Sequence, residues 1–115
     1  MSMIVQLYDF LKQNNVDVYF VGQHKGECLS PYVVLKDGGI NSLNGKAGNK
    51  YLDLIFFIPK NKFTTVEIYR KEVISKVKEF EKLRYTGNET SIVTDDEKKA
   101  LTFSIMYLIQ MKLEG

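Results

Sequence analysis

The chain has 115 residues, of which 44% are hydrophobic and 26% are charged. These are ordinary values for a globular protein, so they argue against a disordered or fibrous chain, and we expect residues 1–115 to form one domain around one core. The 16 lysine and arginine residues exceed the 14 acidic residues by only two. A net charge of +2 argues against a dedicated nucleic-acid binder.

Cysteine usage and hydropathy set expectations for the compartment. Cys28 is the single cysteine, so no internal disulfide can form, and a reducing compartment is expected. Residues 1–11 lack the basic start of a signal peptide, and no apolar run reaches the ~18 residues of a membrane span. We therefore expect a soluble intracellular protein without a membrane partner.

The first third of the chain predicts one helix and two strands. Residues 3–14 have apolar side chains at helical spacing, and residues 16–20 alternate in the manner of a strand. Pro31 precedes a second predicted strand over residues 32–36. Residues 37–50 are rich in glycine and asparagine, which predicts a long, weakly structured loop.

The middle of the chain carries the clearest periodicities. Residues 51–58 are apolar on both faces, which predicts a central strand covered on both sides and ended by Pro59. Residues 64–81 predict the best helix, with charged residues opposite one apolar stripe. The stripe consists of Val66, Tyr69, Val73, Val77 and Phe80.

The last third predicts extended structure. Residues 83–85 and 91–94 suit short strands, with a turn at residues 86–88. Residues 100–113 place seven apolar side chains at successive alternate positions, which favours one long strand. A helix is the weaker interpretation there, although several of these residues are good helix formers. The whole order predicts an α+β domain with a mostly antiparallel sheet, an N-terminal helix and one long amphipathic helix packed on the sheet.

No catalytic, cofactor or metal site is assigned from the sequence. His24 and Cys28 are too few ligands for a tetrahedral metal site, and no third group is specified that would orient them as a nucleophilic pair. Residues 39–46 resemble a phosphate-binding loop only loosely, because the glycine spacing is wrong and Ala47 replaces the required Ser or Thr. The acidic residues 95–97 are interpreted as a turn cap instead of a cation site.

One charge asymmetry remains, around the predicted central strand. Four lysines flank the two ends of this strand and are weak candidates for contacts with a lumen or partner: Lys46, Lys50, Lys60 and Lys62. They could make sequence-independent phosphate contacts. A plain solvated face is the favoured interpretation, because the whole chain is nearly neutral.

The order of elements resembles that of the tail-terminator and head–tail joining proteins of long-tailed bacteriophages, including those of prophage-derived contractile particles. Three segments carry the resemblance: residues 51–59, residues 81–87, and residues 95–100 running into the final strand. Members of this family from Gram-positive prophages are similar to the chain in three features. These are the stretch after the helix, the acidic turn and an alternating last strand that carries a tyrosine.

The resemblance implies a structural role without a cofactor. Such proteins form a ring, typically of six copies, that caps the finished tail tube, offers the head-attachment surface and lets DNA pass during ejection. It therefore implies several partners: copies of the chain itself, tail-tube protein and head-completion or connector proteins. The implied location is a virion or phage-tail-like particle assembled in the bacterial host cytoplasm. The loop at residues 37–50 would order against a neighbour or the tube.

Two alternatives stay open. One is a small regulatory or ligand-binding α+β domain, which could be an enzyme that uses His24, Cys28 and the loop at residues 37–50. The other is a regulatory or toxin–antitoxin partner that pairs through an exposed edge of the last strand.

Overall fold

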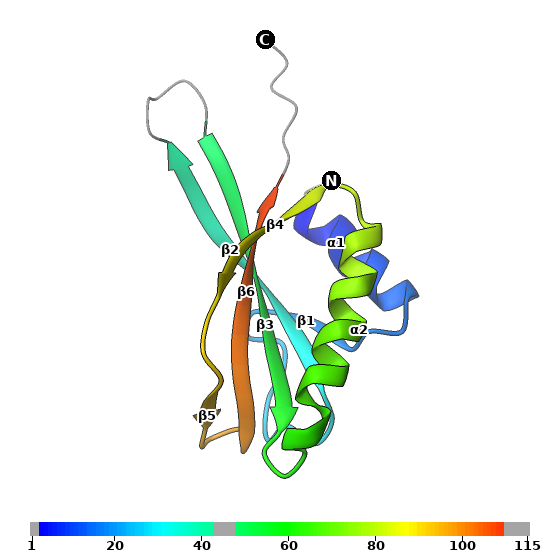
Figure 1. Cartoon of the computed structure of the whole chain (residues 1–115), viewed down its shortest axis with the longest axis vertical. Coiled ribbons are helices and arrows are strands. Elements are labelled where there is room, and N and C mark those ends of the chain that lie inside the picture. The colour runs from blue at the N-terminus through cyan, green and yellow to red at the C-terminus, as the bar shows by residue number, and fades with distance from the viewer. Residues whose placement is uncertain (1–2, 43–47, 110–115) are drawn as a thin grey trace.

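A computed structural model describes residues 3–42 and 48–109 of the chain, and side chains within residues 3–38 and 50–109. The described elements are, in order, α1 (Met3–Gln13), β1 (Val18–Phe20), β2 (Tyr32–Ser42), β3 (Gly48–Pro59), the 3-10 turn η1 (Phe63–Thr65), α2 (Val66–Glu79), β4 (Leu83–Glu89), β5 (Val93–Asp95) and β6 (Ala100–Ile109) (Figure 1).

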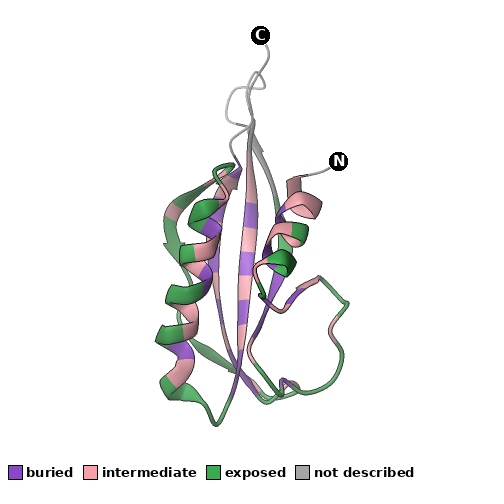
Figure 2. Cartoon of the chain, turned by 90° about the vertical axis from the view of Figure 1, so that its right-hand side faces the viewer, coloured by how far each residue is buried: buried purple, intermediate pink, exposed green. Residues whose placement is uncertain are grey.

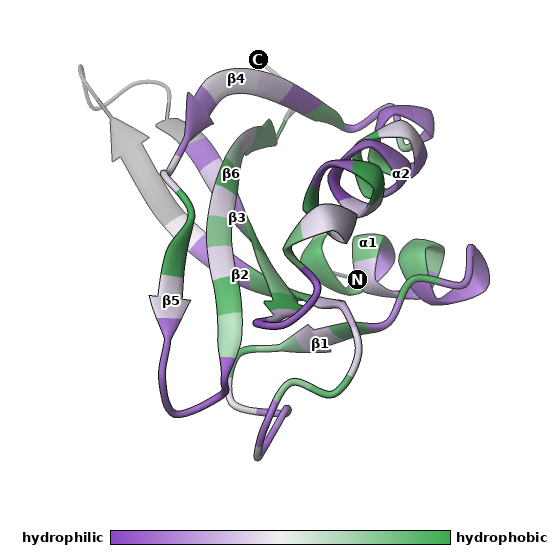
Figure 3. Cartoon of the chain, turned by 60° about the horizontal axis from the view of Figure 1, so that its bottom comes forward, coloured by the Kyte–Doolittle hydropathy of each residue, from purple (hydrophilic) through white to green (hydrophobic). Residues whose placement is uncertain are grey.

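The strands form one sheet in the order β1-β2-β3-β6-β4, and β5 also pairs with β6. Only the β1–β2 pair is parallel, and the other described pairs are antiparallel. Both helices lie on the same side of the sheet, and β5 lies away from them (Figure 3). The predicted α+β class with a mostly antiparallel sheet is therefore confirmed.

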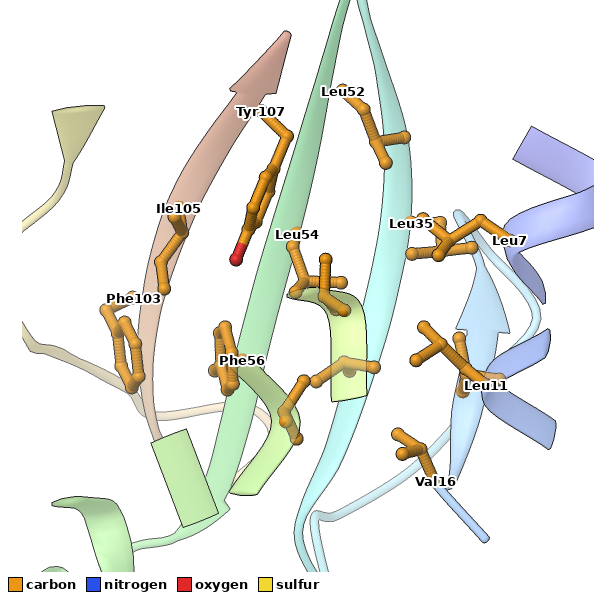
Figure 4. Close-up of a cluster of buried hydrophobic side chains, with 14 of the residues drawn as sticks. Leu7, Leu11, Val16, Leu35, Leu52, Leu54, Phe56, Phe103, Ile105 and Tyr107 are labelled. Carbon is orange, nitrogen blue, oxygen red and sulfur yellow. The ribbon is translucent and has the colours of Figure 1, made fainter. Parts of the chain in front are cut away.

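The main core lies between the helices and one face of the sheet. Buried side chains from β3 and β6 belong to this layer, and Leu7 and Leu11 of α1 join it beside Leu35 of β2 (Figure 4). Phe56 of β3 stacks on Phe103 of β6, with ring centroids 4.6 Å apart. Burying an aromatic pair contributes both apolar area and a specific ring geometry, which fixes the two central strands against each other.

The predicted helix over residues 64–81 is confirmed as η1 followed by α2. Val66, Val73 and Val77 are at most 2% exposed and pack into the core, while Tyr69 and Phe80 pack at its margin. Thr65 stands at the start of α2, but its hydroxyl donates to the carbonyl of Lys62 and does not cap the helix.

The last strand confirms the alternating pattern as far as it is described. Residues 100–109 form β6, whose core-facing residues are buried while those between them are partly exposed. Figure 2 shows the same alternation of buried and partly exposed residues along β3, the neighbouring strand in the centre of the sheet. Residues 110–113 of the predicted strand lie outside the described residues.

The predicted loop over residues 37–50 is wrong at both of its ends. β2 continues through Ser42 and β3 begins at Gly48, and the two strands pair across the whole described stretch. The register shifts at Gly38, where an added Cβ would lie 3.1 Å from Tyr51. A β-bulge at Gly38 therefore allows the glycine- and asparagine-rich residues of β2 to remain paired with β3. The composition of this segment did not indicate the pairing. Residues 43–47 lie outside the described residues.

Two further predictions need correction. The turn expected at residues 86–88 lies within β4, where Gly87 has a φ of +84° and the pairing with β6 is irregular.

The two-sided cover expected for the central strand is only partial. The face of β3 away from the helices keeps Tyr51, Asp53 and Ile55 partly exposed, because both helices pack on the other face.

In the described ranges, neither α1 nor α2 has the length and apolar character needed to span a bilayer.

The packing of α2 on the sheet predicts the effect of Val73→Asp. Val73 is 1% exposed among apolar neighbours, so an aspartate there would bury an unpaired charge. We expect a loss of about 3 kcal/mol or more in the free energy of unfolding, measured by urea denaturation followed by circular dichroism. Lys71→Asp is the matched control on the exposed side of the same helix and should cost about 1 kcal/mol or less. Equal stability of the two variants would contradict the helix-on-sheet packing.

Candidate interaction surfaces

The candidate lysines lie at opposite ends of β3, as predicted, and do not form one patch. Lys50 stands near the start of the strand, whereas Lys60 and Lys62 lie in the turn after Pro59. Ten residues of extended strand separate Lys50 from Lys60 by roughly 33 Å. Lys46 lies outside the described residues. Any contact through these lysines would therefore involve two separate surfaces.

Lys60 and Lys62 border a cleft of about 590 Å³ at the lower end of the molecule in Figure 1. Lys99 and Glu27 form an ion pair of 3.1 Å in its wall, and Lys60 lies 4.0 Å from Asp96. The cations are thus largely offset by carboxylates. Exposed pairs of this kind contribute little stability, and the cleft is not a strongly positive anion site.

Cys28 lines this cleft but is not prepared for nucleophilic chemistry. The thiol is 4% exposed, and its Sγ donates to the carbonyl oxygen of Ser30 at 3.3 Å. Burial raises the pKa of Cys28 to about 11, outweighing the nearby ammonium of Lys98. A thiolate is therefore disfavoured at neutral pH, the opposite of what a catalytic cysteine needs.

His24 is held by aromatic rings. Its imidazole stacks on Tyr32, with ring centroids 3.9 Å apart, and Tyr19 meets it edge-on at 5.0 Å. The buried Nδ1 of His24 has no hydrogen-bond partner among the described residues. Burial lowers the pKa of His24, the ammonium of Lys98 lowers it further, and Asp17 acts in the opposite direction. The neutral imidazole thus serves as a packing group.

Residues 21–31, which carry His24 and Cys28, cover only the lower part of the second sheet face. The backbone N–H of Cys28 donates to the carbonyl of Lys98 at 2.7 Å, which ties this segment to the turn before β6. Beneath it, Tyr32 stacks on Phe57 with centroids 4.9 Å apart. The segment and these rings form a second, smaller apolar cluster behind the sheet.

The rest of the second face is open, and we call it the open face. It consists of the partly exposed residues Tyr51, Asp53, Ile55, Thr102, Ser104, Met106 and Leu108 of β3 and β6. The register places these side chains side by side on the two central strands, because directly opposed residues of an antiparallel pair share a face. A half-apolar sheet face of this kind can accept a protein partner.

The acidic residues 95–97 cap a turn, as predicted. Oδ1 of Asp95 accepts a hydrogen bond of 3.1 Å from the backbone N–H of Lys98. This contact closes the β5–β6 turn that forms part of the cleft wall. In the part of the chain that the structure describes, no three His, Cys, Asp or Glu side chains converge on a metal-sized site.

The idea that the last strand offers an exposed edge is wrong. β6 lies inside the sheet, paired with β3 on one side and with β4 and β5 on the other. The described edges are β1 and, beyond Leu35, β2 on one side, and β4 with β5 on the other. At β1, the backbone of Phe20 is already bonded to Gln23 through both its N–H and its carbonyl. The edge at β4 is therefore a better candidate for strand pairing than the edge at β1.

A polar cluster that the sequence did not indicate ties α2 to this edge. Arg70 donates two short hydrogen bonds to the two carboxylate oxygens of Glu89, at 2.7 and 2.6 Å, and the Tyr85 hydroxyl also donates to Glu89. The hydrogen bond from Arg70 lowers the pKa of Glu89. Bidentate pairs of this type fix geometry as well as charge. Arg70 and Glu89 are 19 residues apart, so no local pattern could have revealed the pair.

No family model, curated protein or solved structure matches this chain.

The environment of His24 predicts a pH dependence. Its pKa is lowered by folding, so its contribution to stability is complete above the ordinary pKa of about 6.5 and is lost as the pH falls toward the lower folded value. We expect NMR titration of this single histidine to give a lower pKa in the folded chain than in urea.

His24→Phe is the control, because a phenyl ring can keep the stacking on Tyr32 but cannot titrate. The native chain should lose stability relative to this variant between about pH 7.5 and about pH 5. A folded-state pKa of His24 at or above the unfolded value would contradict the packing role.

Proposed function

We propose that the chain is a structural subunit of a phage-type tail terminator or head–tail connector, and that copies of it form a ring at the end of a tail tube. The ring caps the tube and offers the surface to which the head attaches. The subunit has no catalytic role in this proposal. It belongs to a virion or phage-tail-like particle assembled in the bacterial host cytoplasm.

The observation that carries the proposal is the open face. Tyr51, Ile55, Met106 and Leu108 leave a half-apolar layer on the two central strands, on the side away from the helices. A subunit that serves by packing against copies of itself or against a tube needs such a face. The long β2–β3 pairing beside it supports the same role, because it extends the sheet toward a neighbour.

The environments of His24 and Cys28 also favour a packing role over catalysis. Cys28 has a raised pKa, His24 has a lowered one, and no hydrogen bond between the two is found among the described residues. An activated Cys–His pair needs the reverse, a thiolate stabilised by an adjacent imidazole. The side chains of His24 and Cys28 instead pack residues 21–31 against the second face of the sheet.

Ring closure in this proposal requires the open face of one copy to meet a different surface of the next copy. When two different surfaces of identical copies meet head to tail, the assembly closes into a ring if the rotation permits. Six copies is the number that the resemblance implies. The near balance of charge suits transient, non-specific passage of DNA, since strong phosphate binding would require a basic lumen.

One observation favours a second candidate, a ligand-binding domain. The cleft of about 590 Å³ beside Cys28 and Lys60 falls within the size range of small-molecule sites. Under this alternative, the chain would act as a monomer or dimer, and changes near the cleft would abolish its activity.

Size in solution tests the proposal. We expect analytical ultracentrifugation to show assembly of the purified chain that rises with concentration toward six copies, and negative-stain images to show rings. The double variant His24→Phe with Cys28→Ala should assemble in the same way, because neither side chain lies on the open face.

Two results would overturn the proposal. One is a chain that stays monomeric at every concentration and does not bind tail-tube protein. The other is a folded double variant that has lost assembly, which would move the functional site to the cleft.

A further inference from the structure

A groove of about 400 Å³ lies between α2 and the edge strand β4, apart from the open face and from the cleft. Ile74 and Val77 of α2 form one wall, and Leu83 with Tyr85 of β4 forms the other. Tyr107 of β6, which is 4% exposed, also lines it. A helix beside an edge strand is the arrangement in which a peptide can add to the sheet and place side chains against the helix.

The strand side of the groove is an edge of the sheet, at which the backbone N–H of Leu83 already donates to the carbonyl of Phe80 at 3.3 Å. β4 ends the strand order and pairs with β6 on its inner side, through Leu83, Arg84 and Tyr85. The register places Leu83 and Tyr85 on the helix side of the sheet, opposite the buried Ile109 and Tyr107, and Arg84 on the other side. Every second side chain of an added strand would thus point into the groove, and the side chains between them would lie on the same side of the sheet as Arg84.

The wall formed by Tyr85 is held in place before any partner arrives. Its ring is 50% exposed, meets Tyr107 at a centroid distance of 6.1 Å, and its hydroxyl donates to Glu89. Glu89 is in turn fixed by Arg70 of α2. A groove whose exposed aromatic wall is already ordered loses less conformational entropy on binding.

The charges around the groove select the occupant. Among the described residues, the charged ones that line it are Lys78 on the helix and Arg84 on the strand, and none is acidic. Both side chains are exposed. An occupant with an apolar side chain between carboxylates would match the apolar walls and both cations.

We propose that this groove binds an extended segment of a partner protein, which adds as a strand to β4 with an apolar anchor over Tyr107 and flanking carboxylates near Lys78 and Arg84. This inference does not rest on the proposed ring, because the apolar walls and Lys78 lie on the helix side of the sheet, although Arg84 lies on the side of the open face, opposite Leu108.

The test is selection of random nine-residue peptides displayed on phage against the full chain. We expect enrichment of sequences with a large apolar residue flanked by Asp or Glu. A synthetic peptide of the enriched sequence should bind at least ten-fold more weakly to Lys78→Glu and to Arg84→Glu. Lys71→Glu is the matched control, since it makes the same charge change on an exposed position of α2 that does not line the groove. It should leave the affinity unchanged.

Strand addition has its own signature. Binding should slow amide hydrogen exchange in residues 83–85, and the same peptide N-methylated on either side of its anchor should lose at least ten-fold in affinity.

Three outcomes would overturn the proposal. The first is that no peptide family is enriched. The second is that enriched peptides bind both groove variants as tightly as the native chain. The third is that Lys78→Glu changes the oligomer size while no peptide binds, which would assign the groove to a second copy of this chain.

Discussion

The structure depends on the alternation of β6 at the centre of the sheet. Phe103, Ile105 and Tyr107 point into the core, and their neighbours point to the open face. β6 pairs with β3 on one side and with β4 and β5 on the other, so its register sets theirs. A slip of one residue would move every core side chain to the opposite face, which is why this register is strongly specified.

The two faces of the molecule follow from that register. The core-facing residues of β3 and β6 need a cover, and the apolar stripes of α1 and α2 provide it on one side only. The other side receives residues 21–31 at its lower end and is otherwise open among the described residues. The same arrangement leaves β4 at an edge beside α2, so the groove and the open face are both consequences of where β6 lies.

The parts of the fold that could be predicted are those with a local signal. The stripe from Val66 to Phe80 and the alternation from Ala100 to Ile109 are visible in the sequence because each repeats within one element. The continuation of β2 to Ser42 was hidden, since glycine and asparagine have low strand propensity and the pairing comes from β3. Contacts between residues far apart in the chain produce no local sequence pattern, so neither the Arg70–Glu89 pair nor the groove could be predicted. The candidate lysines at the two ends of β3 belong to two separate surfaces.

Native-state hydrogen exchange tests the central role of β6 most directly. Amides of residues 103–107, bonded within the middle of the sheet, should exchange among the slowest in the chain and only through global unfolding. Those of Val93–Asp95 in the short strand β5 should exchange much faster, through local opening. Exchange in residues 103–107 as fast as in β5 would show that β6 does not hold the sheet together and would contradict this account.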